Sequence, residues 1–265
     1  MKFGFDPLAL VWLAPGLVLA LWAQWRPPRA FRQGKAVAAT RGITGAQAAA
    51  EVLQMAGVTG VGIEPVEGVL TDHYAPHDKV LRLRPNVYYG QSLAALGVAA
   101  HAAGHALQDV TRYPLLGLRN GLVRMASIGG LLFWLLLMAG CTLMAVQSIW
   151  GAPVLLLGIG AFSLTVLFQL STLPVEFDAS NRARRILVHS DMVTAAEDPV
   201  VQRVLHAAAV THVVALLTTA LLLPYFFIRA GLLERRGEVL PRAGSDSSSR
   251  EAGKRQTARS QDPLG

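Results

Sequence analysis

Hydrophobic residues are concentrated in four long segments of the chain, at about 8–25, 126–146, 154–172 and 205–228. About 20 apolar residues in a helix span the hydrocarbon core of a bilayer. The pattern therefore predicts a mainly α, multi-pass membrane helical bundle. Polar residues are more frequent in 26–124 and 173–204, which we expect to form the soluble part of one domain covering 1–236. The Ser- and Arg-rich end, 237–265, lacks core-forming residues and is predicted to be a disordered tail.

Shorter patterns predict further elements in the soluble part. Thr44 and Gln47 have the spacing of a capping box, which opens a helix that ends near Gly57. An apolar helix is expected at about 91–109, after a break at 86–90. The other expected elements are strands at 61–64, 66–70 and 79–83 and a polar turn at 72–78. The last strand alternates in the manner of an edge strand, and together the strands predict a small β-sheet at the membrane surface.

Composition agrees with a membrane protein. Of the 265 residues, 52% are hydrophobic and 15% are charged, against about 25% charged in soluble domains. The net charge is +7, but the cations cluster beside the apolar segments and in the tail. This distribution favours membrane topology over nucleic-acid binding. The expected partner is therefore a lipid bilayer, and no nucleic-acid partner is expected. The single cysteine, Cys141, excludes an intramolecular disulfide.

The cations at 26–41 follow the first apolar segment, and no acidic residue lies among them. By the positive-inside rule, this side faces the cytoplasm and the N-terminus lies outside. The predicted sheet and soluble part would then lie at the cytoplasmic surface of the cell membrane. Four crossings would place the tail outside, although it carries several arginines. Two explanations stay open: the fourth segment crosses incompletely, or the rule fails here.

Two histidines, His101 and His105, lie four residues apart in the predicted apolar helix. On a helix they share one face, so both imidazoles can reach one zinc ion at about 2.0–2.1 Å. The spacing is that of the H-E-x-x-H zinc peptidase motif, but Ala102 stands at the glutamate position. The bare spacing also occurs often without a metal. Small neighbours such as Gly104 indicate that another element packs closely on this helix.

A third ligand has to come from elsewhere in the chain. Glu176 directly follows the third apolar segment, which returns the chain to the membrane side of His105. Asp178 competes with it, and spacing alone does not choose between them. Taken alone, Glu176 fits better as a solvated carboxylate at a helix start near Arg182.

The sequence resembles the membrane-bound neutral zinc metallopeptidases of bacteria known as YugP-like proteins. The resemblance covers most of the chain up to the fourth apolar segment. It rests on LTDHY at 70–74, KVLRL at 79–83, VAAHAAGHALQ at 98–108 and LPVEFDAS at 173–180. The order of motifs is also similar to that of HtpX-type and CAAX-prenyl-protease membrane metallopeptidases.

The resemblance implies a zincin-like metal-site helix with His101, His105 and Glu176 as zinc ligands, in a gluzincin-type centre. Related enzymes carry an aspartate four residues after the glutamate. Here that position is Ser180, so Asp178 is the remaining candidate to support a ligand.

The implied activity is peptide-bond hydrolysis by zinc-activated water on the cytoplasmic side, with a protein or peptide substrate. Because Ala102 replaces the general base, the chain is expected to bind zinc and to be inactive or crippled. A natural pseudoenzyme and a deliberately inactivated form are both open. The alternative function is a non-catalytic membrane scaffold or peptide-binding pseudoprotease, with a membrane-protein partner possible.

Other candidate residues are weaker. His73, in the predicted turn, could contact substrate or an oxyanion, although a solvated turn residue fits it better. His206 and His212 lie within the fourth apolar segment, where ionisable residues are unusual. Gly129-Gly130 and Gly158-x-Gly160 indicate close helix packing rather than ligand loops. The strand at 79–83 could bind an extended substrate by strand addition.

Overall fold

The computed structural model describes residues 7–67 and 72–229. The predicted tail at 237–265 lies outside the described residues. The described chain is mainly helical with one small sheet, which confirms the predicted fold class. Its elements are α1 (Pro7–Lys35), α2 (Gly45–Met55), β1 (Gly62–Pro65), β2 (His73–Ala75), β3 (Val80–Leu83), α3 (Pro85–Tyr88), α4 (Leu93–Val110), α5 (Pro114–Ala145), α6 (Gly151–His189) and α7 (Asp198–Arg229).

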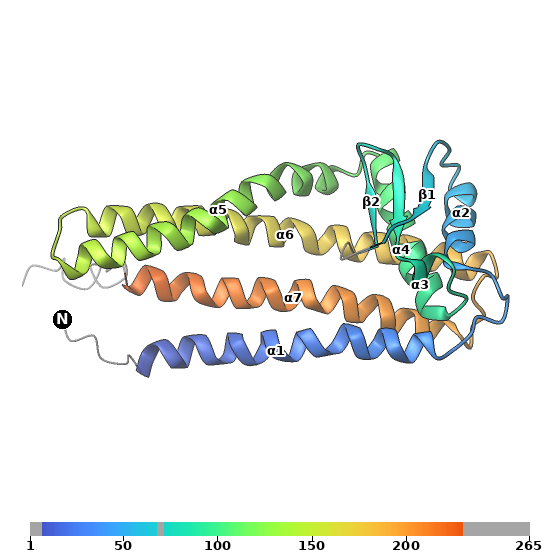
Figure 1. Ribbon diagram of the computed structural model, residues 1–265, viewed down its shortest axis with the longest axis horizontal. Coiled ribbons are helices and arrows are strands. Elements are labelled where there is room, and N and C mark those ends of the chain that lie inside the picture. Colours follow the sequence, from blue (N-terminus) through green and yellow to red (C-terminus); the bar gives the residue numbers. More distant parts are fainter. Residues whose placement is uncertain (1–6, 68–71, 230–265) are drawn as a thin grey trace, which may run out of the picture. The chain divides into compact units, whose positions relative to one another are not determined.

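Four long helices, α1, α5, α6 and α7, run side by side, and the sheet lies with α2, α3 and α4 near one end of them (Figure 1). Within the described residues, α5, α6 and α7 contain stretches long and apolar enough to cross a membrane. They correspond to the predicted segments 126–146, 154–172 and 205–228. The searched apolar stretch of α1 is only Ala14–Ala23, so the segment 8–25 stays a prediction.

The helix α6 is longer than a bilayer requires. Its 39 residues extend about 58 Å at 1.5 Å per residue, against about 30 Å of hydrocarbon core. The helix continues through Pro174, and the polar stretch after the apolar segment belongs to the same helix. The last four turns of α6 therefore form a rigid scaffold beside α4.

The hairpin of α5 and α6 packs through small residues, as membrane helices commonly do. A Cβ atom at Gly129 would lie 2.7 Å from Ala161 O, and one at Gly158 would lie 3.1 Å from Leu136. These contacts confirm the close packing predicted at Gly129 and Gly158. The prediction is wrong for Gly160, which meets open space.

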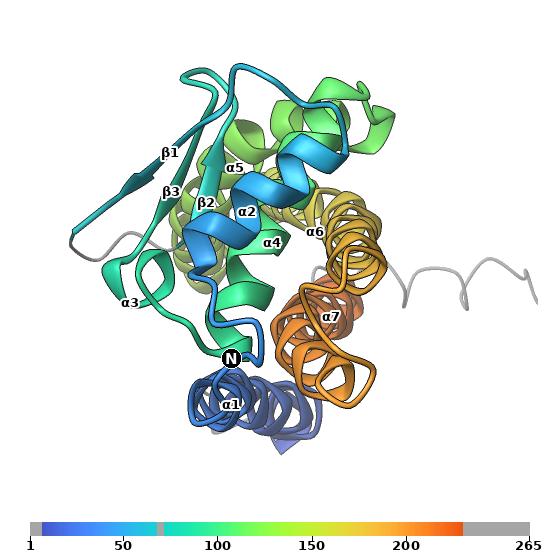
Figure 2. The same ribbon diagram turned by 90° about the vertical axis from the view of Figure 1, so that its right-hand side faces the viewer.

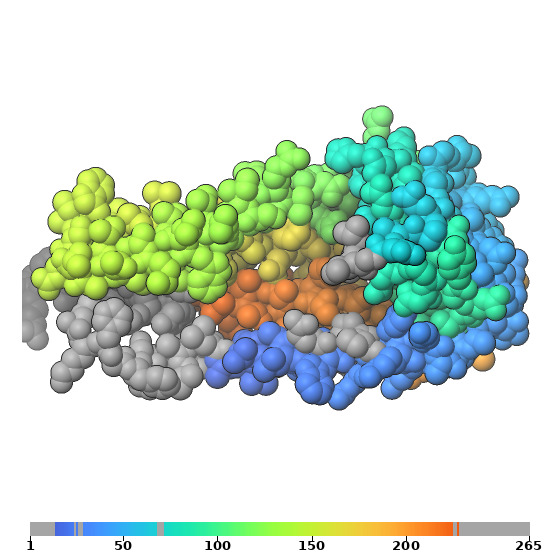
Figure 3. Space-filling view, in the orientation of Figure 1, coloured from blue at the N-terminus to red at the C-terminus, as the bar shows by residue number. Residues whose placement is uncertain are grey.

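At the end with the sheet, α4 contacts both α2 and α6 (Figure 2). Helix α2 opens with the predicted capping box of Thr44 and Gln47, and Ser92 caps α4 through the backbone N–H of Ala95. A core of buried aliphatic residues joins α2, the sheet, α4 and α6. In the space-filling view, atoms of α7 are visible between α1 and α5 (Figure 3).

The sheet has the order β1-β3-β2, with β1 parallel and β2 antiparallel to β3. The prediction of an edge strand at 79–83 is therefore wrong, because β3 is central. Its alternation reflects one buried face, and Arg82 on the other face forms ion pairs with Glu64 and Asp78 at 2.9 Å.

The polar segment 72–78, predicted as a turn, contains β2. This strand forms because Tyr74 is buried and donates a hydrogen bond to Asp109 of α4 at 2.8 Å. The predicted break at 86–90 contains most of the short helix α3. Of the predicted strand 66–70, residues 66–67 are not in a strand, and 68–70 lie outside the described residues.

A buried carboxylate joins the two connections at this end of the long helices. Glu197, before α7, accepts hydrogen bonds from the backbone N–H and hydroxyl groups of both Thr40 and Thr194, at 2.7–2.8 Å. Burial alone raises the pKa of Glu197, but these four hydrogen bonds outweigh it and lower the pKa to about 2.

Candidate metal centre

The histidine helix α4 crosses α6 at very short range. Any Cβ atom at Gly104 would collide with the backbone carbonyl of Ala179. This confirms the predicted close approach and explains the glycine, which otherwise weakens a helix by about 1 kcal/mol relative to alanine. The contact brings the face of α4 that carries His101 and His105 against the first polar turns of α6.

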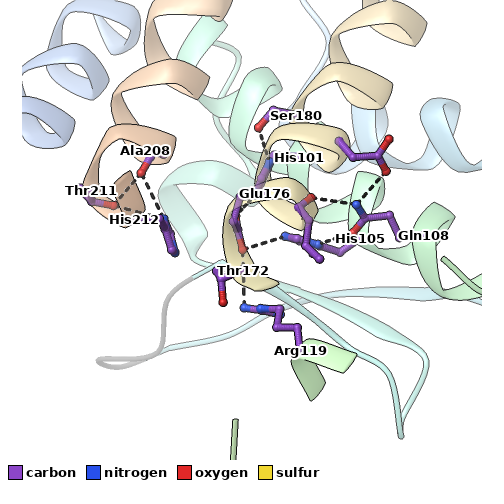
Figure 4. A network of polar contacts seen from close by, with 12 residues as sticks. His101, His105, Gln108, Arg119, Thr172, Glu176, Ser180, Ala208, Thr211 and His212 are labelled. Atoms are coloured by element: carbon purple, nitrogen blue, oxygen red, sulfur yellow. Dashed lines mark hydrogen bonds and ion pairs between the residues drawn. The ribbon is translucent and has the colours of Figure 1, made fainter. Parts of the chain in front are cut away.

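Three side chains converge at this crossing (Figure 4). Glu176 Oε2 lies 3.2 Å from His101 Nε2, and Glu176 Oε1 lies 3.7 Å from His105 Nε2. The two imidazole rings are 4.8 Å apart and nearly perpendicular. Among the described residues, these three form the group whose ligand atoms, all within 4.8 Å of one another, could hold a metal ion.

The donor set fits zinc. Two atoms bound to one tetrahedral zinc at about 2.0–2.2 Å lie about 3.3–3.6 Å apart, close to the distances between Glu176 and the two histidines. Two imidazoles and one carboxylate also form the ligand set of a catalytic zinc that keeps a fourth position open. The ligand atoms together spread over up to 4.8 Å, so the side chains would have to draw closer to share one ion.

The tautomer of His105 is fixed by Gln108. The amide nitrogen of Gln108 donates to Val175 O at 2.8 Å and to Asp178 Oδ2 at 2.9 Å. Both partners only accept, so the amide oxygen must face His105 Nδ1, 3.0 Å away. His105 Nδ1 therefore carries the proton, and the lone pair of Nε2 points towards Glu176. Such an outer hydrogen bond orients a metal-binding histidine.

Ser180 has the corresponding place beside His101. Its hydroxyl lies 3.0 Å from His101 Nδ1, one helical turn after Glu176. A hydroxyl both donates and accepts, so Ser180 can support either tautomer of His101. Its oxygen can accept a hydrogen bond from Nδ1–H when Nε2 is needed as a metal ligand. The position at which related enzymes carry an aspartate thus keeps a hydrogen-bonding partner in this chain.

Asp178 does not take that place. It accepts hydrogen bonds from Gln108 and, at 2.6 Å, from Arg182 Nε. Its influence on His105 passes through Gln108, one contact further from the metal site than expected. The reason is helical geometry, because residues two apart on α6 point about 200° away from each other.

Two cationic or ionisable side chains that the sequence reasoning did not assign to the site lie beside it. Arg119 Nη2, from the first turns of α5, is 3.5 Å from Glu176 Oε1. Among the described residues, Arg119 Nε is one of three buried side-chain polar atoms without a hydrogen-bond partner. His212, from α7, is near enough to affect His101 electrostatically, and Figure 4 shows it beside Glu176.

Burial lowers the pKa of His101, and repulsion from His105 and His212 lowers it further. Together these effects outweigh the hydrogen bond and attraction of Glu176, which raise the pKa. The neutral imidazole is the form that binds a metal. Arg119 lies just before the second apolar segment, a position that by itself indicates membrane topology and not a metal site.

The other predicted residues lie elsewhere. Ala102 is 1% exposed and belongs to the buried core. His73 lies on β2 opposite Arg82 and does not belong to the described metal-binding group. His206 is exposed and lines a groove between α1 and α7, and His212 is not among the residues that line it.

Comparison with known proteins gives two matches. The family model described as "Putative neutral zinc metallopeptidase" matches residues 9–231. The chain is 41% identical over 203 residues to "Putative membrane protease YugP" of Bacillus subtilis (strain 168), a match that covers 77% of this chain and 88% of that protein. No solved structure matches the chain at a significant level.

Proposed function

Because the chain belongs to the family described as "Putative neutral zinc metallopeptidase", we propose that it is a membrane metallopeptidase in which His101, His105 and Glu176 hold zinc. The observation that carries the proposal is the convergence of two imidazoles and one carboxylate at the α4–α6 crossing. The hydrogen bonds of Gln108 and Ser180 to the far nitrogens of the two imidazoles support it.

A bound zinc ion would supply an activated water and polarise the carbonyl of a peptide bond. The protein side chains around it have separate roles. Glu176 and the histidines hold the site, and Arg119 offers positive charge beside it for a substrate carbonyl oxygen. Ala102 has no group that could accept or return a proton. Loss of a general base costs about 10²–10⁴-fold in rate, so hydrolysis by this chain is slow or absent.

A second function, a peptide-binding scaffold without turnover, is favoured by the packing of Ala102. Its methyl group is almost completely buried in the core, as in a helix whose face serves packing. A protein or peptide is the proposed ligand in both cases. Strand addition would use β2, which lies at an edge of the sheet and is joined to α4 by the hydrogen bond from Tyr74 to Asp109.

Replacement of Ala102 by glutamate separates the two functions. The new carboxylate would lie about 100° round the helix from His101, so it would not replace a ligand. We expect unchanged zinc content by elemental analysis and a gain of about 10²–10⁴-fold in chelator-sensitive casein hydrolysis. Ala103→Glu adds the same charge at a neighbouring buried position and should show no gain. If Ala102→Glu retains zinc and stays inert, the scaffold function is favoured.

We also propose that the metal centre faces the cytoplasm. The cations at 26–41 lie near the C-terminal end of α1, the end that carries α4 and the sheet (Figure 1). Thr59 is exposed in the loop between α2 and β1. After removal of Cys141, a cysteine replacing Thr59 should resist an impermeant thiol reagent in intact cells and react after lysis. Labelling in intact cells would refute the orientation.

A further inference from the structure

A groove of ≈ 630 Å³ lies between the C-terminal half of α1 and the N-terminal half of α7. Figures 1 and 2 both show these two helices side by side. Arg29, Arg203 and His206 line the groove, together with Trp22 and Trp25. We propose that this groove binds the headgroup of an anionic phospholipid. The proposal does not depend on the proposed metallopeptidase function.

The charge of the groove is cationic and is not neutralised locally. None of the lining residues that the structure describes is acidic. The acid in the first turn of α7, Asp198, is engaged by both Arg184 Nε and Arg184 Nη2. Arg203 donates through Nε to Pro199 O at 3.2 Å, which leaves its terminal nitrogens to reach the groove. Arginine binds phosphate oxygens with paired donors, and basic pockets between membrane helices bind lipid headgroups.

The aromatic residues give the groove the character of a membrane interface. The guanidinium of Arg29 lies 5.6 Å from the ring centre of Trp25, within the range of a cation–π contact. Trp22 and Trp25 are 49% and 62% exposed. Tryptophan is enriched at the level of the lipid headgroups, so these rings mark the depth at which a phosphate would lie.

Apolar surface continues from the groove in the direction that acyl chains would take. Val18 and Leu21 are 64% and 54% exposed and lie on the face of α1 that carries Trp25. Val18 precedes Arg29 by 11 residues, about 16 Å along the helix axis. A phosphate at Arg29 would therefore have its acyl chains beside exposed aliphatic side chains. A free phosphate ion would use only the cations and would gain nothing from this surface.

The test measures lipid selectivity of the full-length protein in detergent by native mass spectrometry. Phosphatidylglycerol and phosphatidylcholine with identical acyl chains are added in equal amounts. The wild-type protein should retain phosphatidylglycerol preferentially. The double variant Arg29→Gln/Arg203→Gln should lose about 30-fold of this preference, the size expected for two interfacial cations. The variant Arg29→Lys/Arg203→Lys should keep most of it.

The matched control is Arg112→Gln/Arg185→Gln, which removes the same charge at two exposed positions outside the groove. It should keep the full preference, and circular dichroism should show all variants folded. An equal loss in this control would mean that only the overall charge matters, and it would overturn the proposal. Preference retained in Arg29→Gln/Arg203→Gln would also overturn it, as would displacement of the lipid by an equal concentration of inorganic phosphate.

Discussion

Replacement of Gln108 by leucine should weaken zinc binding although every ligand is retained. Gln108 is fully buried and fixes the proton of His105 on Nδ1 through its two donor bonds on the other side. Without it, His105 can turn or carry its proton on the ligating nitrogen. Loss of such an outer partner typically costs 10–100-fold in metal affinity, or about 1.4–2.8 kcal/mol. Loss of the buried hydrogen bonds from Gln108 to Val175 O and Asp178 Oδ2 would cost a further ~1–3 kcal/mol of folding stability.

The two effects are separable in one experiment. Zinc affinity is measured by competition with a chromophoric chelator, and stability by thermal unfolding of the metal-free protein. Ser92→Ala is the control because it removes the cap of the same helix, at a cost of about 0.5–2 kcal/mol, without touching a ligand. It should lower stability and leave zinc affinity unchanged. Unchanged affinity in Gln108→Leu, or equal loss in Ser92→Ala, would refute the role of Gln108.

Three further predictions concern zinc content, helix packing and pH. Glu176→Ala should remove zinc, as measured by elemental analysis, whereas Asp178→Ala should leave most of it. The opposite result would mean that Asp178, and not Glu176, is the ligand. Gly104→Ala should lower the free energy of unfolding by about 1–3 kcal/mol, because the new Cβ would collide with the backbone carbonyl of Ala179. Gly160→Ala should not lower it, because a Cβ there meets open space. Glu197 has a folded pKa of about 2 and an ordinary value of 4.5, so the carboxylate contributes up to about 3 kcal/mol to folding stability. This contribution is present above pH 4.5 and is lost as the pH falls through 2. Glu197→Gln should flatten this part of the stability–pH profile, and an unchanged profile would contradict the prediction.

The features predicted correctly from the sequence are local ones. The length of an apolar run and the i, i+4 spacing of His101 and His105 are both properties of one helix, and so is the capping box at Thr44. The place of a strand in a sheet is not local. The alternation in β3 indicates that one face is buried, but its central position depends on β1 and β2, and β2 is joined to α4 by the hydrogen bond from Tyr74 to Asp109.

The residues of the candidate site also fall into those that local sequence patterns indicate and those that only the packing of helices brings together. The order of motifs suggested that a carboxylate after the third apolar segment returns to the histidines, but spacing left Glu176 and Asp178 equal. The structure separates them by their direction on α6. Gln108 and Ser180 carried a usable signal, because they lie three and four residues after His105 and Glu176 on the same faces. His212 comes from another helix, so its contact with the site required the packing of α7.

The proposed function separates metal binding from hydrolysis, and the two rest on different residues of this chain. Gln108 and Ser180 are polar groups 0% and 7% exposed, and burying them without hydrogen bonds would cost free energy. Both bind the far nitrogen of an imidazole, an arrangement that helix packing alone does not require. Ala102, by contrast, contributes only a methyl group to the core. The proposed ligands therefore have hydrogen-bonding partners on their far nitrogens, whereas Ala102 offers no group that could move a proton, so zinc loading should be measured independently of turnover.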